Sequence, residues 1–203
     1  LGAQVIETDW QGFGIQKQRA VRCVSTEWAF SIDCDEVVSE ALKNEILQTL
    51  KHPLYSVYRM PRLNHLCRRP VRCAGWYPDF VDRLFRVGEA QFSDSLVHES
   101  LVFSCSSGTL KSPLLHYSYD DLDSAIDKLN RYSSLAAVSL MSRRRRIGRL
   151  TPLLRMCYRF FYAFVLRGGW LGGLDGFSAS LLQAVEVYFK YCKVLRGARD
   201  FKL

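Results

Sequence analysis

The hydrophobic pattern of this chain changes its period near residue 120, and that change limits the folds open to the chain. Before this point, short apolar runs typical of strands alternate with segments of about ten residues that have a helical pattern. Strands mixed with short helices predict an α/β sandwich. The expected helices are 15–25 and 40–50, and the expected strands are 3–6, 28–32, 55–60, 81–85, 90–92, 95–99 and 114–117.

Local signals add detail to this first part of the chain. The run 28–32 is almost continuously apolar, which is typical of a parallel strand covered on both faces. Ser39 is a favourable N-cap for the helix 40–50, and Pro53 closes that helix. The basic segment 62–72 is expected to be a loop.

From Asp120 onward the pattern is that of helices. Residues 152–167 and 174–195 predict two strongly apolar helices on either side of a glycine-rich break at 168–173. Both helices contain charged residues, so neither reads as a clean transmembrane span. We therefore expect two regions, an α/β domain and a helical region, with these bounds: 1–119 and 120–203.

The basic charge is concentrated in the last third of the chain. Residues 1–142 have a net charge of −2, whereas residues 143–203 carry +10 and include the run Arg143–Arg146. A tail that is both basic and apolar predicts contact with an anionic membrane surface. Nucleic acid is the other partner of clustered arginines, but the aromatic residues of a nucleic-acid module are not interleaved here, so none is expected. Soluble helical packing and a solvated arginine run are the alternatives to a membrane-associating tail.

Cysteine usage indicates the redox environment of the chain, and the first residues bear on where the domain begins. Seven cysteines without a Cys-x-x-Cys pair indicate reducing surroundings rather than a disulfide scaffold. The segment Gln4-Val5-Ile6 reads as a strand already inside a domain. We therefore expect the domain to be N-terminally incomplete, with its first part lying before Leu1.

An acidic turn is the strongest chemical signal in the sequence. Asp33-Cys34-Asp35-Glu36 directly follows the apolar run 28–32. In open α/β sheets, ligands bind at the carboxyl ends of strands. Two carboxylates two residues apart can reach one hard cation, Mg²⁺ or Mn²⁺, which shares its ligands with substrate phosphates. The alternative is a solvated acidic turn that leads into the next helix.

Several sequence blocks follow one another along most of the chain: 10–17, 28–36, 75–79, 83–86, 97–99 and 114–119. Together they resemble family 2 glycosyltransferases of the lipopolysaccharide core β-1,4-glucosyltransferase type, and the ordered set makes the resemblance more specific than any single block. Two departures are small: Cys34 stands where the family often has Ala, and Gln18 where it often has Asn.

The resemblance implies a GT-A fold, which is Rossmann-like, and an inverting, metal-dependent enzyme. It implies transfer of a hexose from a nucleotide sugar to a lipid-linked saccharide such as the lipopolysaccharide inner core. UDP-glucose is the favoured donor. It also implies an N-terminal part, before Leu1, that binds the nucleobase and ribose. The place of work would be the cytoplasmic face of the bacterial inner membrane.

The acidic turn supplies the expected metal and donor residues. Asp33 and Asp35 would hold the metal with the donor diphosphate, so that the leaving group's charge is neutralised. Lys17 would add positive charge near the diphosphate, although a solvated helix face accounts for it equally well. His98 is a further candidate for the metal, with a structural role as the alternative.

The acceptor hydroxyl requires a general base, which is normally a carboxylate. Asp79 is the first candidate, because it resembles the acidic position that precedes Arg-Leu in the family, and Glu99 is its rival. Trp76 and Tyr77 offer apolar faces for a sugar ring, with core packing as the alternative. His116 is interpreted as a core or supporting residue.

Two other functions are compatible with the same sequence. One is a non-catalytic membrane-surface binding module that keeps part of the GT-A fold. The other is a metal-dependent phosphodiesterase built on the acidic turn, which would need more histidine ligands than the four scattered along the chain.

Overall fold

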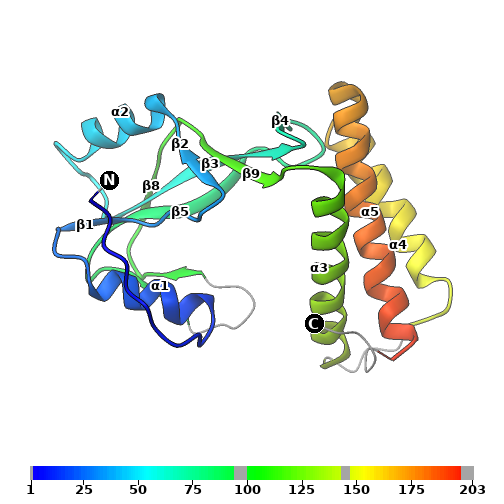
Figure 1. The fold of residues 1–203 in the computed structure, drawn as a ribbon. Helices are drawn as coiled ribbons and strands as arrows, with labels where there is room; N and C mark the ends of the chain where they lie inside the picture. The colour runs from blue at the N-terminus through cyan, green and yellow to red at the C-terminus, as the bar shows by residue number, and fades with distance from the viewer. Residues whose placement is uncertain (1, 94–99, 143–146, 198–203) are drawn as a thin grey trace.

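The computed structural model describes residues 2–93, 100–142 and 147–197, and it consists of a twisted sheet followed by long helices (Figure 1). The main sheet has seven strands, with the path β1-β5-β3-β9-β2, and β4 and β8 both pair with β3. A separate pair of short strands, β6 and β7, lies beside α1. The strands are β1 (Trp28–Phe30), β2 (Glu36–Val38), β3 (Val57–Leu66), β4 (Arg69–Pro70), β5 (Asp79–Arg86), β6 (Gln91–Phe92), β7 (Leu101–Val102), β8 (Ser107–Thr109) and β9 (Leu114–Tyr119).

Two short helices cover opposite faces of this sheet, α1 (Phe13–Arg22) and α2 (Glu40–Thr49) (Figure 1). Successive strand residues point to opposite faces, and β5 shows this at its centre. Leu84 packs with Leu42 and Ile46 of α2, whereas Phe85 packs in the cluster that contains Val21 of α1. The mixed α/β fold predicted from the sequence is therefore confirmed.

The start of α2 follows its local signal. The Ser39 hydroxyl accepts a hydrogen bond from the backbone amide of Leu42 at 3.2 Å, as an N-cap residue does. The same hydroxyl donates to the Pro113 carbonyl at 3.2 Å, so the cap also joins α2 to the segment before β9.

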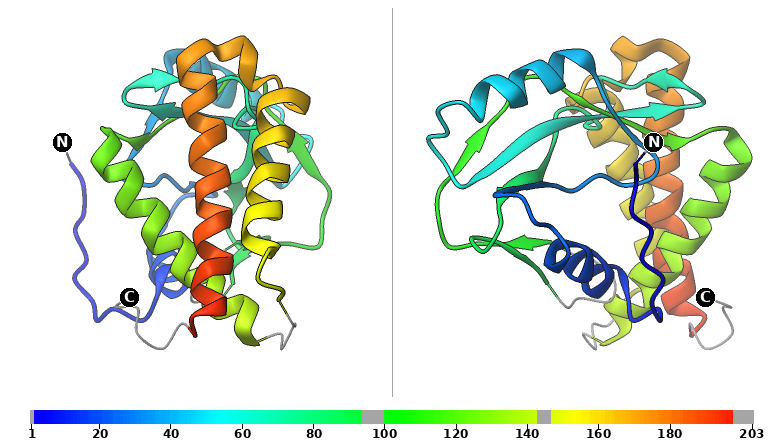
Figure 2. Two further views of the ribbon diagram at one scale, coloured as in Figure 1. Left: turned by 90° about the vertical axis from the view of Figure 1, so that its right-hand side faces the viewer. Right: turned by 60° about the vertical axis from the view of Figure 1, so that its left-hand side comes forward.

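Three helices form the second part of the chain, with α5 packed between α3 and α4 (Figure 2). Lys193 of α5 is buried and its Nζ donates to the hydroxyls of Ser133 and Ser134 of α3 at 2.8 and 2.7 Å. The expected glycine-rich break is confirmed, because a short 3-10 helix separates the last two helices. The elements are α3 (Leu122–Ser142), α4 (Thr151–Phe161), a π-helix (Tyr162–Leu166), the 3-10 helix (Gly169–Gly172) and α5 (Gly173–Leu195).

The sheet and the helices share one apolar cluster. Leu66, the last residue of β3, and Val71, which follows β4, pack with Ala125, Ala163 and Ala179 of the helical part. Small residues allow the helices to approach the hairpin closely, so the helical part is packed directly against the sheet part. None of the helices in residues 2–93, 100–142 and 147–197 is both long and apolar enough to span a lipid bilayer.

Some expected elements differ from the structure. Residues 3–6 form no strand, since they pair with no described part of the sheet, and Val5 is 83% exposed. The run 28–32 was expected to be a parallel strand, but β1 is an edge strand and pairs antiparallel with β5. The segment 62–72 was expected to be a loop, but β3 continues to Leu66 and turns back as β4. The expected strand 95–99 lies outside the described residues.

Candidate active site

The acidic turn crosses the sheet from one edge to the other. Strands β1 and β2 lie at opposite ends of the strand order, so the segment 31–35 between them passes the strands β5, β3 and β9. The backbone amide of Ser31 still bonds to the Arg83 carbonyl of β5 at 2.9 Å, and that of Tyr117 of β9 bonds to the Asp35 carbonyl at 2.9 Å. This crossing brings the carboxylates of the turn against side chains from three strands.

Asp33 is held by two cations. Lys17 of α1 places its Nζ 2.7 Å from Asp33 Oδ1, and Arg83 of β5 bonds to Oδ2. Burial alone would raise the pKa of Asp33, but the Lys17 hydrogen bond and the Arg83 charge outweigh it, so the pKa lies below its usual value. Arg83 also bonds to Glu36, whose side chain is fully buried. Both oxygens of Asp33 thus have a cationic partner.

Asp79 stands at the first position of β5 and pairs across the strands with Arg62 of β3. Arg62 donates to Asp79 Oδ2 from Nε at 3.0 Å and from Nη2 at 2.7 Å, and Asn64 Nδ2 lies 3.4 Å from the same oxygen. Asp79 Oδ1 accepts no hydrogen bond from the residues that the structure describes. One oxygen of this carboxylate is therefore anchored and the other is available.

His116 of β9 adjoins the second carboxylate of the turn. Its Nε2 lies 3.3 Å from Asp35 Oδ2, while its Nδ1 lies 2.6 Å from Asn64 Oδ1 and 2.8 Å from Ser118 Oγ. Burial and the charge of Arg62 lower the pKa of His116 below its usual value, which favours the neutral ring near pH 7. The donor roles depend on the tautomer: Nδ1–H would donate to Asn64 Oδ1, and Nε2–H would donate to Asp35 Oδ2.

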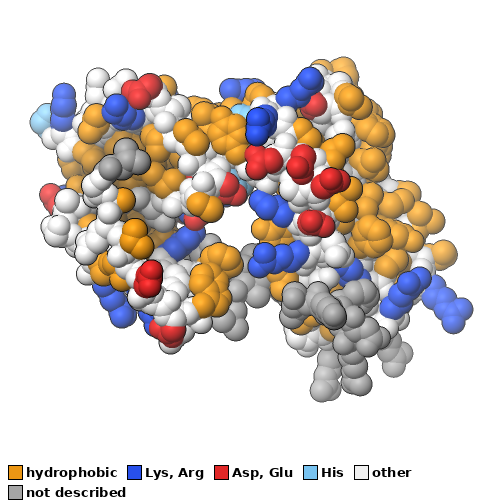
Figure 3. Space-filling model, in the orientation of Figure 1, with side chains coloured by type: hydrophobic (Ala, Val, Ile, Leu, Met, Phe, Trp, Pro, Cys, Tyr) orange, Lys and Arg blue, Asp and Glu red, His pale blue; other side chains and the backbone are white. Residues whose placement is uncertain are grey.

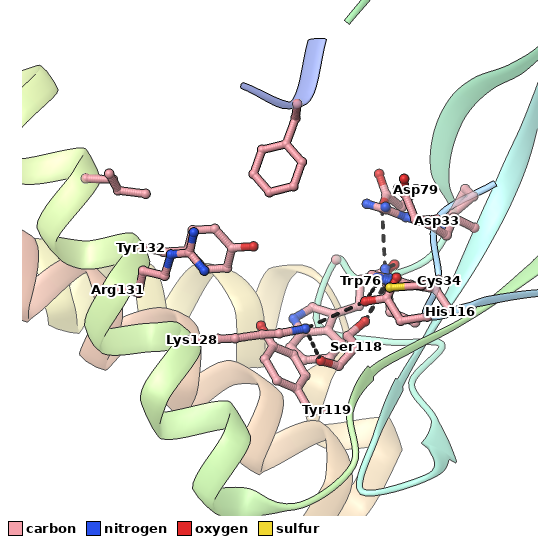
Figure 4. A pocket seen from close by; sticks show the side chains of 17 residues that line it. Asp33, Cys34, Trp76, Asp79, His116, Ser118, Tyr119, Lys128, Arg131 and Tyr132 are labelled. Carbon is pink, nitrogen blue, oxygen red and sulfur yellow. Dashed lines mark hydrogen bonds and ion pairs between the residues drawn. The ribbon is translucent and has the colours of Figure 1, made fainter. Parts of the chain in front are cut away.

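A cavity of about 870 Å³ opens beside these groups, between the sheet and α3 (Figure 3). This volume is in the range of small-molecule sites. Figure 4 shows the acidic residues on one wall and Lys128, Arg131 and Tyr132 of α3 on the other. The lining also includes Phe13, Asp33, Cys34, Asp35, Arg62, Asn64, Gly75, Trp76, Pro78, Asp79, His116, Ser118, Tyr119 and Leu135.

Trp76 supplies an aromatic surface within this cavity. Its ring centroid lies 5.8 Å from that of Tyr119. The preceding Gly75 has φ +77°, a backbone conformation that favours glycine and shapes the turn before Trp76. Tyr77 lies outside the lining, and its ring packs against the Arg72 guanidinium at 5.2 Å. Of the two proposed stacking residues, the structure thus brings only Trp76 to the cavity.

The predicted site residues divide into three groups. Asp33, Asp35 and Asp79 line one cavity, and Lys17 joins them through Asp33. Tyr77 lies outside the lining of this cavity. His98 and Glu99 lie outside the described residues.

Several residues that the structure places at this site have weak signals or none in the sequence. Arg83 is one of four charged residues in β5, so nothing in the sequence marks it as the buried one. Arg62 was assigned to a loop, and Lys128 was one of several polar residues on a helix. Lys128 Nζ lies 3.7 Å from Asp35 Oδ2 and 2.6 Å from the Ser118 carbonyl oxygen.

A divalent cation fits Asp35 better than Asp33. Both oxygens of Asp33 already accept bonds from cations. Asp35 Oδ2 adjoins His116 Nε2 at 3.3 Å and Lys128 Nζ at 3.7 Å, so Oδ1 is the oxygen of this carboxylate that could bind Mg²⁺ or Mn²⁺. The described residues contain no cluster of three or more His, Cys, Asp or Glu that could hold a metal. Such an ion would thus need ligands from substrate phosphates, as is usual for Mg²⁺.

The known proteins that this chain matches are named glycosyltransferases. The chain is 30% identical over 194 residues to a lipopolysaccharide core biosynthesis glycosyltransferase, LpsC of Rhizobium meliloti, covering 91% of this chain and 70% of LpsC. It is 27% identical over 207 residues to an uncharacterized glycosyltransferase of Rickettsia bellii, covering 96% of this chain and 70% of the relative. An uncharacterized glycosyltransferase of Rickettsia prowazekii is 29% identical over 216 residues, with coverages of 100% and 72%. No protein-family model matches the chain.

Proposed function

Because this chain belongs to a family of glycosyltransferases, we propose that it transfers a hexose from a nucleotide sugar to a lipid-linked saccharide. The favoured donor is UDP-glucose and the favoured acceptor is the lipopolysaccharide inner core. The acceptor class is in line with the name of the Rhizobium relative, which refers to lipopolysaccharide core biosynthesis. The fold would be GT-A-like and the enzyme would belong to family 2. The observation that carries the proposal is the acidic turn, which lines a substrate-sized cavity together with Asp79.

The geometry supports an inverting displacement. The acceptor oxygen forms a bond to the anomeric carbon while the bond from that carbon to the diphosphate breaks, and the bonding electrons leave with the diphosphate. Asp79 Oδ1 takes the proton of the acceptor hydroxyl, since Arg62 and Asn64 hold Oδ2 and fix the carboxylate's orientation. Glu99 is the alternative base.

Positive charge near the acidic turn would stabilise the departing diphosphate. Lys17 and Lys128 lie on either side of the turn, at 2.7 Å from Asp33 and 3.7 Å from Asp35. A Mg²⁺ or Mn²⁺ ion held by Asp35 and the substrate phosphates would supply further positive charge at the leaving oxygen.

The Asp35→Asn variant tests this proposal. Transfer should fall by about 10²–10³-fold, because the carboxylate that would hold the cation at the departing diphosphate is lost. The measurement is release of nucleoside diphosphate and labelling of lipid acceptors from a panel of radiolabelled nucleotide sugars. Asp127→Asn is the matched control, since Asp127 is exposed on α3 and does not line the cavity. Wild-type turnover by Asp35→Asn would contradict the site, and full activity in excess chelator would contradict the metal.

The same assay separates the rival functions. A phosphodiesterase would release nucleoside monophosphate instead of diphosphate. A non-catalytic binding module would consume no nucleotide sugar from any donor in the panel.

An outward-facing apolar surface supports the proposal that the protein acts at a membrane. In a surface helix the apolar stripe normally faces the core, but in α4 the only buried residue is Pro152. The exposed apolar residues lie at helical spacing, and Figure 3 shows hydrophobic side chains over this side of the molecule. This membrane surface comprises Leu150, Leu153, Leu154, Tyr158, Phe161, Val165, Leu166, Trp170, Leu171 and Leu174.

Arginines complement this membrane surface. Arg149, Arg155 and Arg167 are exposed at or near α4, and the run Arg143–Arg146, outside the described residues, precedes it. Arginines beside exposed apolar side chains match an anionic bilayer, which offers both phosphate groups and acyl chains. The place that we propose for the reaction is the cytoplasmic face of the bacterial inner membrane, which the family resemblance implies and an affinity for an anionic bilayer would suit.

Sedimentation with vesicles tests the membrane surface. The chain should pellet with anionic vesicles and release only in part at high salt, because buried apolar side chains are not screened. Replacing Arg143–Arg146 with Gln should weaken binding by up to about 4 kcal/mol, at about 1 kcal/mol per residue. Replacing Leu153 and Leu154 with Gln should remove the salt-resistant part, whereas Leu122→Gln, an exposed leucine of α3, should not.

Two outcomes would argue against a membrane. One is that the intact chain ignores anionic vesicles at low salt. The other is that it sediments as a dimer that the Leu153 and Leu154 replacements dissociate, in which case a second copy covers the membrane surface.

A further inference from the structure

Helix α3 presents one face to the cavity. Lys128, Arg131, Tyr132 and Leu135 all line it, and their spacing of three, four and seven residues from Lys128 places them on one side of a helix. Figure 4 shows Arg131 and Tyr132 on the wall opposite Asp33 and Asp79. The cavity thus has an acidic wall from the sheet and a basic, aromatic wall from α3.

The negative charges of the acidic wall already have cationic partners. Asp33 pairs with Lys17 and Arg83, Asp35 adjoins Lys128, and Asp79 pairs with Arg62. Of the basic side chains on the lining, Arg62 and Lys128 are used in these pairs.

Arg131 differs from these cations. Among the residues that the structure describes, it has no carboxylate partner and no hydrogen-bond acceptor, although it lines the cavity and is exposed to it. A guanidinium offers a planar fork of donors that matches carboxylate and phosphate oxygens. Its charge would remain uncompensated in the cavity until an anion enters.

We propose that Arg131 and the adjoining Tyr132 form an anion subsite that takes a phosphate or carboxylate group of a substrate. The proposal rests on the proposed function, since it assigns this wall of the cavity to a substrate of glycosyl transfer. Lys128, one helical turn away, adds positive charge to the same wall. The anionic group has two sources, the diphosphate of the donor and an acidic group on the acceptor saccharide.

Calorimetric titration of the full chain with two probes distinguishes these sources. Inorganic pyrophosphate stands for the donor diphosphate, and glucose 6-phosphate stands for an acidic acceptor sugar. Arg131→Gln should weaken binding of at least one probe by about 10-fold or more, the effect of one charged hydrogen bond. Arg131→Lys keeps the charge but loses the fork, so it should recover only part of the affinity. Arg22→Gln, at an exposed residue of α1 outside the lining, is the matched control and should bind as the wild type does.

Each result of the titration either supports or overturns the proposed anion subsite. Loss confined to pyrophosphate supports the donor as the source, and loss confined to glucose 6-phosphate supports the acceptor. No binding of either probe by the wild type, or equal binding by the wild type and Arg131→Gln, overturns the subsite. Because the titration requires no transfer, a chain that bound the probes through Arg131 but transferred no sugar would contradict the proposed function alone.

Discussion

Replacing Arg83 with Met is expected to destabilise the fold by about 3–5 kcal/mol, because the buried Glu36 then keeps only the more distant Arg62, at 3.5 Å, as a cationic partner. The Arg83 side chain is only 8% exposed and bonds to both Asp33 and Glu36. The Glu36 side chain is completely buried, so water cannot replace the lost guanidinium. Much of the expected cost is the desolvated carboxylate that remains.

Urea unfolding of matched variants measures this effect. Arg86→Met on the same strand is the control, since Arg86 is 43% exposed and pairs with the exposed Glu27. That surface pair should contribute less than about 1 kcal/mol. Adding Glu36→Leu to Arg83→Met should recover part of the stability, because the stranded charge is then removed. A loss for Arg83→Met no larger than that for Arg86→Met would show that the pair is not a buried support of the acidic turn.

Replacing Asp79 with Asn is expected to lower kcat by about 10²–10⁴-fold, the usual contribution of a general base. The amide keeps the size of the carboxylate but cannot accept the proton of the acceptor hydroxyl. The KM for the nucleotide sugar should change little, because Asp79 contacts Arg62 and Asn64 rather than the donor-side turn. Steady-state transfer at varied donor concentration separates the two parameters.

Two further variants complete that experiment. Asp82→Asn lies on the same strand as Asp79 but outside the cavity lining, so its kcat should remain near the wild-type value. Glu99→Gln should lower kcat less than Asp79→Asn does. If Glu99→Gln abolishes turnover while Asp79→Asn stays near wild type, the roles of the two carboxylates are reversed.

Elements with a local signal could be predicted from the sequence alone. The helix α2 begins after Ser39 as expected, because an N-cap acts within one turn of backbone. The break at Gly169–Gly172 and the acidic turn after the first apolar strand were likewise visible. Hydrophobic period and turn chemistry are properties of neighbouring residues, so they can be read without knowledge of the fold.

Strand direction and order depended on the tertiary structure. The apolar run that contains Trp28–Phe30 resembled a parallel strand, yet it forms an antiparallel edge strand whose faces are covered by other parts of the chain. Apolar residues indicate that a strand is buried, but they do not indicate which strand lies beside it. Residues 3–6 show the converse, since an apolar run without a described sheet partner forms no strand.

The candidate site shows the same contrast between what neighbouring residues indicate and what the tertiary structure decides. The sequence by itself indicated the acidic half of the candidate site, because Asp33 and Asp35 lie two residues apart in the chain and Asp79 follows a recognisable turn. Only the tertiary structure decided their partners, among them Arg83, His116 and the α3 wall. The physical reason is that an ion pair or a cavity wall depends on distance in space. The crossing of the acidic turn over the sheet, and the packing of α3 beside it, bring together residues that are far apart in the sequence.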